Sequence, residues 1–208
     1  MGYTFEQWRE RYSQRSDISS YLVHLTRPIF NKEGETIKTS IDVLNEILTS
    51  KKLIGSTTQK GYIVGKNKAV CFQDMPLQSV CQNVLFEELR TEDKKKRRYV
   101  PIGIAFPKTY VYQKGGRPVM YEKKEVAKKI LPEDEWWRIV NLNLDDKSNY
   151  IDWMHEREWR LKGDFEFELS QAVVLLSNTT SYKLFIQNTD EKILQELSGI
   201  NMMKPIIL

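Results

Sequence analysis

Short apolar runs that alternate with polar positions outnumber helical patterns along this chain. Strands are predicted at residues 21–26, 69–72, 99–106, 117–121, 152–162 and 172–177, and residues 181–187 also alternate. Helical spacing is found at residues 5–15, 41–48, 79–89, 123–130 and 190–197, and another helix is predicted to start near Pro132. Strands and helices interleave irregularly, which favours an α+β fold over a doubly wound parallel sheet.

Length and composition set broad limits on the class of protein. With 208 residues, 40% apolar and 11% aromatic, we expect a single domain over residues 1–208 with a proper core. The sequence has no apolar run of membrane-spanning length and no apolar secretory segment near residue 1, so we expect a cytoplasmic protein without a membrane partner. Cys71 and Cys81 lack the spacing of a zinc site or a disulfide framework.

Positive charge is concentrated in one stretch of the chain. Residues 94–129 carry twelve Lys or Arg and two acidic residues, against 32 basic and 28 acidic residues overall. This asymmetry favours a nucleic acid or another acidic partner, although the run at 94–98 alone also fits a solvated loop. Arg117 and Tyr121 fall on one face of an expected strand inside this block. The candidate nucleic-acid contacts are Lys95, Lys96, Arg97, Arg98, Arg117 and Tyr121.

Common cofactor and metal motifs are missing or incomplete. The run His155-Glu-Arg-Glu158 lacks the second histidine of a zinc helix, and residues 61–67 fall short of a phosphate-binding loop. No Gly-x-Gly-x-x-Gly follows a strand. No metal site is therefore assigned. A nuclease stays open as an alternative, because Asp152, Glu156 and Glu158 could share a magnesium ion.

The two histidines of the chain mark two unusual strands. His24 and Thr26 share a strand face, and Glu156, Glu158 and Arg160 share another if residues 152–162 form one strand. A Glu158–Arg160 ion pair on a solvated sheet face would be an ordinary structural feature. The neighbouring Trp153 and Trp159 would instead partly desolvate the carboxylate, which favours a pocket.

These segments, taken in order, resemble a known family. A His-x-Thr strand, a helix, a Val-Cys-Phe strand ending in Pro76-Leu77, and a late Glu-Trp-Arg-Leu strand are similar to DarT-type ADP-ribosyltransferases. They are also similar to the CmdT-like and AbiGi-like toxins of phage-defence and toxin–antitoxin systems. The resemblance covers residues 20–162. It implies an ADP-ribosyltransferase fold of two packed small β-sheets with flanking helices around an NAD cleft.

The resemblance also implies roles for individual residues. His24 and Thr26 correspond to the early strand motif that contacts NAD, and Phe72 to a surface beside the nicotinamide. Glu158 corresponds to the catalytic glutamate, with Glu156 as the other candidate. The family's loop arginine is missing from residues 55–68, where only lysines occur, and Arg27 is the candidate replacement for the phosphate contact.

The chemistry of this family fits a fixed carboxylate. Breaking the nicotinamide–ribose bond of NAD gives an oxocarbenium-like sugar, as in glycoside cleavage. A carboxylate placed beside that sugar typically contributes roughly 3–4 kcal/mol. We therefore predict an NAD-dependent transferase that releases nicotinamide and modifies a DNA or RNA base, with a cognate antitoxin protein as a possible partner. The alternatives are the metal-dependent nuclease and a non-catalytic module of the same fold that binds nucleic acid or an antitoxin.

Overall fold

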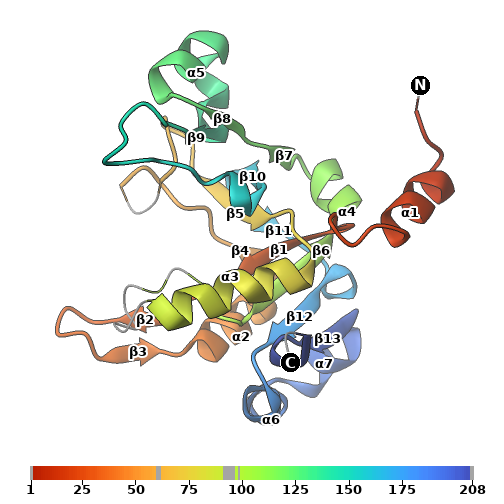
Figure 1. Ribbon diagram of the computed structural model, residues 1–208. Helices are drawn as coiled ribbons and strands as arrows, with labels where there is room; N and C mark the ends of the chain where they lie inside the picture. Colours follow the sequence, from red (N-terminus) through yellow and green to blue (C-terminus); the bar gives the residue numbers. More distant parts are fainter. Residues whose placement is uncertain (1, 60–61, 91–96, 98, 207–208) are drawn as a thin grey trace. The chain divides into compact units, whose positions relative to one another are not determined.

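The computed structural model describes residues 2–59, 62–90, 97 and 99–206 (Figure 1). The chain divides into two compact units, each built from segments that are distant in sequence. The first unit comprises Met1–Lys51, Met75–Pro107 and Phe167–Leu208, and the second comprises Lys52–Asp74 and Lys108–Glu166. Both units contain helices and strands, so the α+β class is confirmed. The single domain over the whole chain stays a prediction.

The first unit contains four principal strands in the order β13-β12-β6-β1. They are β1 (Tyr21–Leu25), β6 (Gly103–Pro107), β12 (Val173–Leu176) and β13 (Gly199–Met202). The β12–β13 pair is parallel and the other two pairs are antiparallel. A small hairpin joins β2 (Ile29–Phe30) to β3 (Thr36–Lys38). The helices of this unit are α1 (Phe5–Ser13), α2 (Ser40–Ser50), α3 (Leu77–Arg90), α6 (Thr179–Asn188) and α7 (Glu191–Glu196), with 3₁₀ turns η4 (Leu169–Gln171) and η5 (Lys204–Ile206).

Alternating side chains give the first unit its core. Val23, Ala105 and Leu175 lie on one face of the strands, where they cluster with Val80 and Cys81 of α3. The strands approach closely at Gly103, where a Cβ atom would come within 2.2 Å of the carbonyl oxygen of His24. A larger residue at position 103 would therefore push β6 away from β1, which is why this position favours glycine.

Helix caps explain where the predicted helices begin. The hydroxyl of Thr39 accepts from the backbone N–H of Asp42, and the Asp42 carboxylate accepts from the N–H of Thr39, which together start α2. Asn178 and Ser181 form the same reciprocal arrangement at the start of α6. The alternating pattern at residues 181–187 was therefore misread: this segment is helical, and Phe185 is its buried contact.

The second unit contains three antiparallel strands in the order β5-β10-β7, which are β5 (Ala69–Gln73), β10 (Glu158–Lys162) and β7 (Arg117–Pro118). Two smaller pairs are β4 (Lys52–Leu53) with β11 (Phe165–Glu166), and β8 (Met120–Glu122) with β9 (Ile139–Asn141). Its helical segments are α4 (Lys108–Gln113), α5 (Lys124–Ile130) and the 3₁₀ helices η2 (Glu133–Arg138) and η3 (Met154–Glu156).

The two faces of the β5–β10 pair differ in chemistry. Phe72 packs edge-on against Phe165, and Tyr110 does the same from the other side of Phe165. The opposite face carries Ala69, Cys71 and Gln73 from β5, because alternate residues of a strand point to opposite sides. One face is therefore an aromatic core, and the other presents polar groups.

Three predicted strands differ from the observed ones. Residues 99–102 precede β6 rather than forming part of it, with the N–H of Ile102 bonded to the carbonyl of Val100. The segment 117–121 divides into β7 and β8, which belong to different sheets. The strand predicted from residue 152 begins only at Glu158. Within the described residues, no helix has the length and apolar character needed to cross a membrane.

Candidate active site

A tight turn places Glu158 at the start of β10. The Asp152 carboxylate accepts from the N–H of Met154 at 2.8 Å, and residues 154–156 form the 3₁₀ turn η3. Arg157 then adopts a left-handed conformation with φ of 46° before the strand begins. Glu156 and Glu158 consequently do not share a strand face. The prediction of one continuous face for residues 156, 158 and 160 was wrong, because the local Asp152 turn competes with strand pairing.

The Glu158 carboxylate is held by a forked contact with Arg160. Nε of Arg160 donates to Oε1 at 2.7 Å, and Nη2 donates to Oε2 at 3.3 Å. The side chains of Arg160 and Glu158 are only 3% and 9% exposed. The ion pair considered from the sequence is therefore present, but it is buried rather than on a solvated face. A buried carboxylate fixed by a planar guanidinium has a defined orientation.

Arg160 is itself anchored to the backbone. Its Nη1 donates to the carbonyls of Trp137 at 2.8 Å and of Ile139 at 3.0 Å. Burial of the guanidinium lowers the pKa of Arg160, but the charge of Glu158 more than offsets it and the net pKa is raised. The guanidinium is thus a permanently charged support for Glu158. Sequence reasoning gave Arg160 no role in the site, because its carbonyl partners lie more than twenty residues away.

The backbone of Glu158 is also fixed. Its N–H donates to the hydroxyl of Tyr121 at 2.6 Å, and its carbonyl accepts from the N–H of Val119 at 3.1 Å. Burial, together with the charge of Glu158, raises the pKa of Tyr121 to about 12. Tyr121 therefore supports Glu158 as a neutral phenol. The expectation that Tyr121 and Arg117 lie on one strand face was wrong, because β7 and β8 are separate strands.

Cys71 and Gln73 lie across from this ion pair. The strand register places Gln73 opposite Glu158 and Cys71 opposite Arg160, so the four side chains share one face. Burial, with the negative charge of Glu158, raises the pKa of the Cys71 thiol, which keeps it protonated. Gln73 is 8% exposed, and its Oε1 has no hydrogen-bond partner among the described residues. The sequence carried one signal for Gln73, an amide at the end of an apolar strand.

A second polar contact lies next to the other face of β10. The Lys108 ammonium contacts the Asp74 carboxylate at 2.6 Å, and Nε1 of Trp159 donates to the same carboxylate at 3.1 Å. Trp159 therefore points away from Glu158, contrary to the expectation that it desolvates that carboxylate. Nε1 of Trp137 is buried without a partner among the described residues, and it lies above Ala69 and Cys71 on the Glu158 face.

Three of the predicted NAD contacts lie in the first unit. His24 is half-buried on β1 and Arg27 is exposed just beyond it. Thr26 is 3% exposed, and its hydroxyl lies 3.1 Å from the carbonyl of Ile102 and 3.3 Å from that of Ser40. These bonds give Thr26 a structural role within the first unit, whereas Glu158 belongs to the second.

The remaining predicted residues have varied surroundings. Phe72 is 1% exposed in the aromatic core, so the structure places it inside the second unit rather than on an open stacking surface. Nη1 of Arg117 donates to the carbonyls of Tyr112 and Gly116, and its guanidinium lies 4.1 Å from the Tyr112 ring. Arg97 is half-buried, and Lys95, Lys96 and Arg98 lie outside the described residues.

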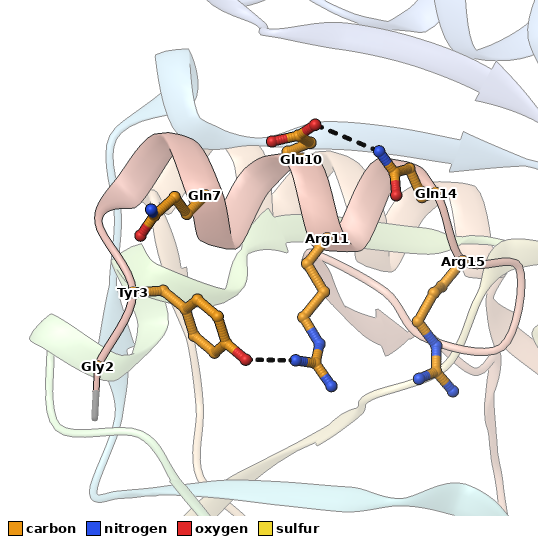
Figure 2. Close-up of a pocket in the computed structure, with 7 residues that line it drawn as sticks. All are labelled: Gly2, Tyr3, Gln7, Glu10, Arg11, Gln14 and Arg15. Atoms are coloured by element: carbon orange, nitrogen blue, oxygen red, sulfur yellow. Dashed lines mark hydrogen bonds between the residues drawn. The ribbon is translucent and has the colours of Figure 1, made fainter.

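Two further surveys concern metals and cavities. Among the described residues, no three His, Cys, Asp or Glu side chains group as metal ligands. A hollow of about 650 Å³ lies beside α1, away from all the predicted site residues. Figure 2 shows its lining, where Arg11 donates to the Tyr3 hydroxyl and Arg15 lies alongside. This open hollow contains side chains of α1 and its flanking residues only, and we assign it no role in the chemistry.

Comparison with known proteins does not extend this description. No protein-family model matches the chain, and neither curated proteins nor solved structures gave a match. The functional argument therefore depends on the geometry around Glu158 and on the resemblance of short motifs.

Proposed function

We propose that this protein is an ADP-ribosyltransferase that uses NAD as substrate, releases nicotinamide and modifies a DNA or RNA base. The observation that carries the proposal is the Glu158 carboxylate, fixed at the first residue of β10 by the fork of Arg160. The motif resemblance places the family's catalytic glutamate at this residue. A carboxylate that must stabilise a short-lived cationic sugar needs a fixed position, and this one has it.

The contacts of Glu158 leave capacity for a substrate. A carboxylate has about four acceptor positions, and Arg160 uses one on each oxygen. The free positions suit a ribose hydroxyl and the positive charge that develops at the sugar carbon. Arg160 and Tyr121 would act as positioning residues, since they hold the side chain and the backbone of Glu158 respectively.

Glu156 is the weaker candidate for the catalytic carboxylate. It lies in the η3 turn, before the left-handed Arg157, whereas Glu158 begins a paired strand. We therefore assign the charge-stabilising role to Glu158. The Glu156→Gln variant is expected to keep most of the activity.

The acceptor proposal rests on charge and exposed aromatic surface. Residues 94–129 are strongly basic, and within them Tyr112 is 52% exposed with Arg117 stacked over its ring. Exposed aromatic rings beside cationic side chains bind single-stranded nucleic acid by stacking and charge attraction. An antitoxin protein as partner, and a role in phage conflict, come from the resemblance alone.

Labelled NAD tests the proposal directly. The purified chain is incubated with NAD labelled in the adenylate part and with single-stranded DNA, RNA or lysate protein in separate reactions. We expect label in one nucleic-acid class, and a loss of about 10²–10³-fold in transfer for Glu158→Gln. Glu166→Gln is the matched control, because this exposed carboxylate on β11 only contacts Lys52.

The fold of the variant needs its own check. Glu158→Gln leaves Arg160 without its buried countercharge, so thermal melting and circular dichroism accompany the assay. The double variant Glu158→Gln with Arg160→Met restores a neutral site and should also be inactive. Equal transfer by Glu158→Gln and the unmutated chain would overturn the proposal. Strand cleavage that EDTA abolishes, or nucleic-acid binding without nicotinamide release, would point to the nuclease or the binding module.

A further inference from the structure

We propose that Gln73 is a ligand-binding residue whose side-chain carbonyl accepts a hydrogen bond from an uncharged amide or hydroxyl donor held beside Glu158. This inference deepens the proposed function and rests on it. In NAD, the matching donors are the carboxamide of nicotinamide and the hydroxyls of the adjoining ribose.

The first argument is the unsatisfied acceptor. Gln73 is 8% exposed, and within the described chain its Oε1 has no donor. A buried acceptor without a partner typically costs about 1–3 kcal/mol. Buried polar groups in folded proteins are nearly always bonded, so an unpaired amide oxygen indicates a partner that binds from outside the chain.

The second argument is position. Gln73 lies directly opposite Glu158 in the β5–β10 register, so the two side chains are neighbours on one face. The nearby donors are already directed elsewhere: Arg160 to Glu158 and two carbonyls, and the N–H of Glu158 to Tyr121. The free acceptor is therefore next to the carboxylate to which we assign the chemistry.

The third argument is the chemistry that this pair would select. An amide oxygen beside a carboxylate attracts hydrogen-bond donors and repels anions. A carboxamide N–H or a ribose hydroxyl meets both conditions, and the pyrophosphate of NAD meets neither. Sites built to hydrogen-bond a ligand also reject analogues that lack the group, because the protein acceptor is then left unpaired. Gln73 would therefore contribute to specificity as well as affinity.

The key variant is Gln73→Met, which keeps the length of the side chain and removes its polar atoms. Because the amide oxygen is unsatisfied without ligand, the unliganded variant should melt about 2–4 °C higher than the unmutated chain. Affinity for the ligand should fall about tenfold or more. Gln73→Ala, which cannot crowd the site, must show the same loss of affinity. Gln113→Met is the control, because Gln113 is exposed on α4 of the same unit.

Calorimetry with three probes identifies the donor. NAD, nicotinamide alone and ADP-ribose alone are titrated into each variant. Weaker nicotinamide binding, with ADP-ribose binding unchanged, assigns the donor to the carboxamide, and the reverse assigns it to a ribose hydroxyl. If the unmutated chain binds NAD and Gln73→Met binds it equally well, or if the variant melts lower with no loss of affinity, Gln73 is structural and the inference fails alone. If the unmutated chain binds none of the three, the proposed function fails and takes this inference with it.

Discussion

Two ion-pair clusters of the second unit have similar distances and opposite surroundings. Arg160 and Glu158 approach to 2.7 Å, as do Lys68 and Asp164. The first pair is at most 9% exposed, whereas Lys68 is 42% and Asp164 17% exposed. Distance alone therefore says little about the importance of an ion pair. In the buried pair each charge requires the other, while water can replace the partner of the exposed one.

The clusters also differ in what they hold in place. Asp164 accepts from the N–H of Gly55 and contacts two lysines, so it joins the loop after β4 to the segment before β11. Arg160 joins β10 to the carbonyls of Trp137 and Ile139, and through Glu158 it determines where a charged oxygen lies. The surface cluster fastens two loops, and the buried pair positions a functional group.

Removing one member of the buried pair should have the largest effect. Arg160→Met leaves the Glu158 carboxylate buried without a countercharge, so the free energy of unfolding should fall by about 3–5 kcal/mol. Urea denaturation at pH 7 measures this loss. Adding Glu158→Met to the same chain should restore most of the stability, because both charges are then absent. A single variant as stable as the double one would show that the pair is effectively solvated.

A neutral contact of the same carboxylate residue should matter less. Tyr121→Phe removes the hydroxyl that accepts from the N–H of Glu158, at a cost of about 1–2 kcal/mol in unfolding free energy. Hydrogen exchange of the Glu158 amide, measured by NMR, should quicken in the variant. Tyr112→Phe, whose ring is half exposed, is the control. Unchanged exchange would mean that the Tyr121 hydroxyl does not hold this backbone group.

The exposed cluster should give the smallest effect, and one that depends on pH. The ammonium of Lys68, together with the N–H of Gly55, lowers the pKa of Asp164 to about 2. Because the folded-state pKa is depressed, the contribution is present above the ordinary carboxyl pKa and is lost as the pH falls from about 4 towards 2.

Asp164→Asn tests this dependence, since it removes the charge while keeping an oxygen for Gly55. At pH 7 the variant should be less stable by no more than about 1 kcal/mol. Denaturation at several pH values should show the two chains converging below about pH 4. A difference that stays constant down to pH 3 would contradict the assigned cause.

Local patterns were sufficient for most elements of secondary structure. The helix at 40–50 follows from its apolar spacing and its Thr39 cap, and the strands β1, β5 and β12 follow from short apolar runs. The errors occurred where side chains bond to nearby backbone. Asp152 makes a turn where alternation predicted a strand, and Asn178 starts a helix at a segment that alternates.

The site was only partly predictable for a different reason. Glu158 was identified from its strand motif, and its possible pairing with Arg160 from their spacing of two residues. The carbonyls of Trp137 and Ile139, the hydroxyl of Tyr121 and the amide of Gln73 come from other elements, and their proximity depends on strand register. Register is set by tertiary pairing, and one residue of slip would place every side chain of a strand on the opposite face.

The way in which the two units interleave along the chain has a consequence for synthesis. The second unit lies between segments of the first, and β12 and β13 of the first unit follow the last residue of the second. A growing chain can therefore pair β1 with β6 early, but β6 must wait for its other neighbour until the ribosome has also produced β10 and β11. Pairings between distant segments close slowly and leave strand edges uncovered in the meantime. For this protein, the hazardous period for aggregation falls late in translation, and no single cut of the gene separates one unit intact from the other.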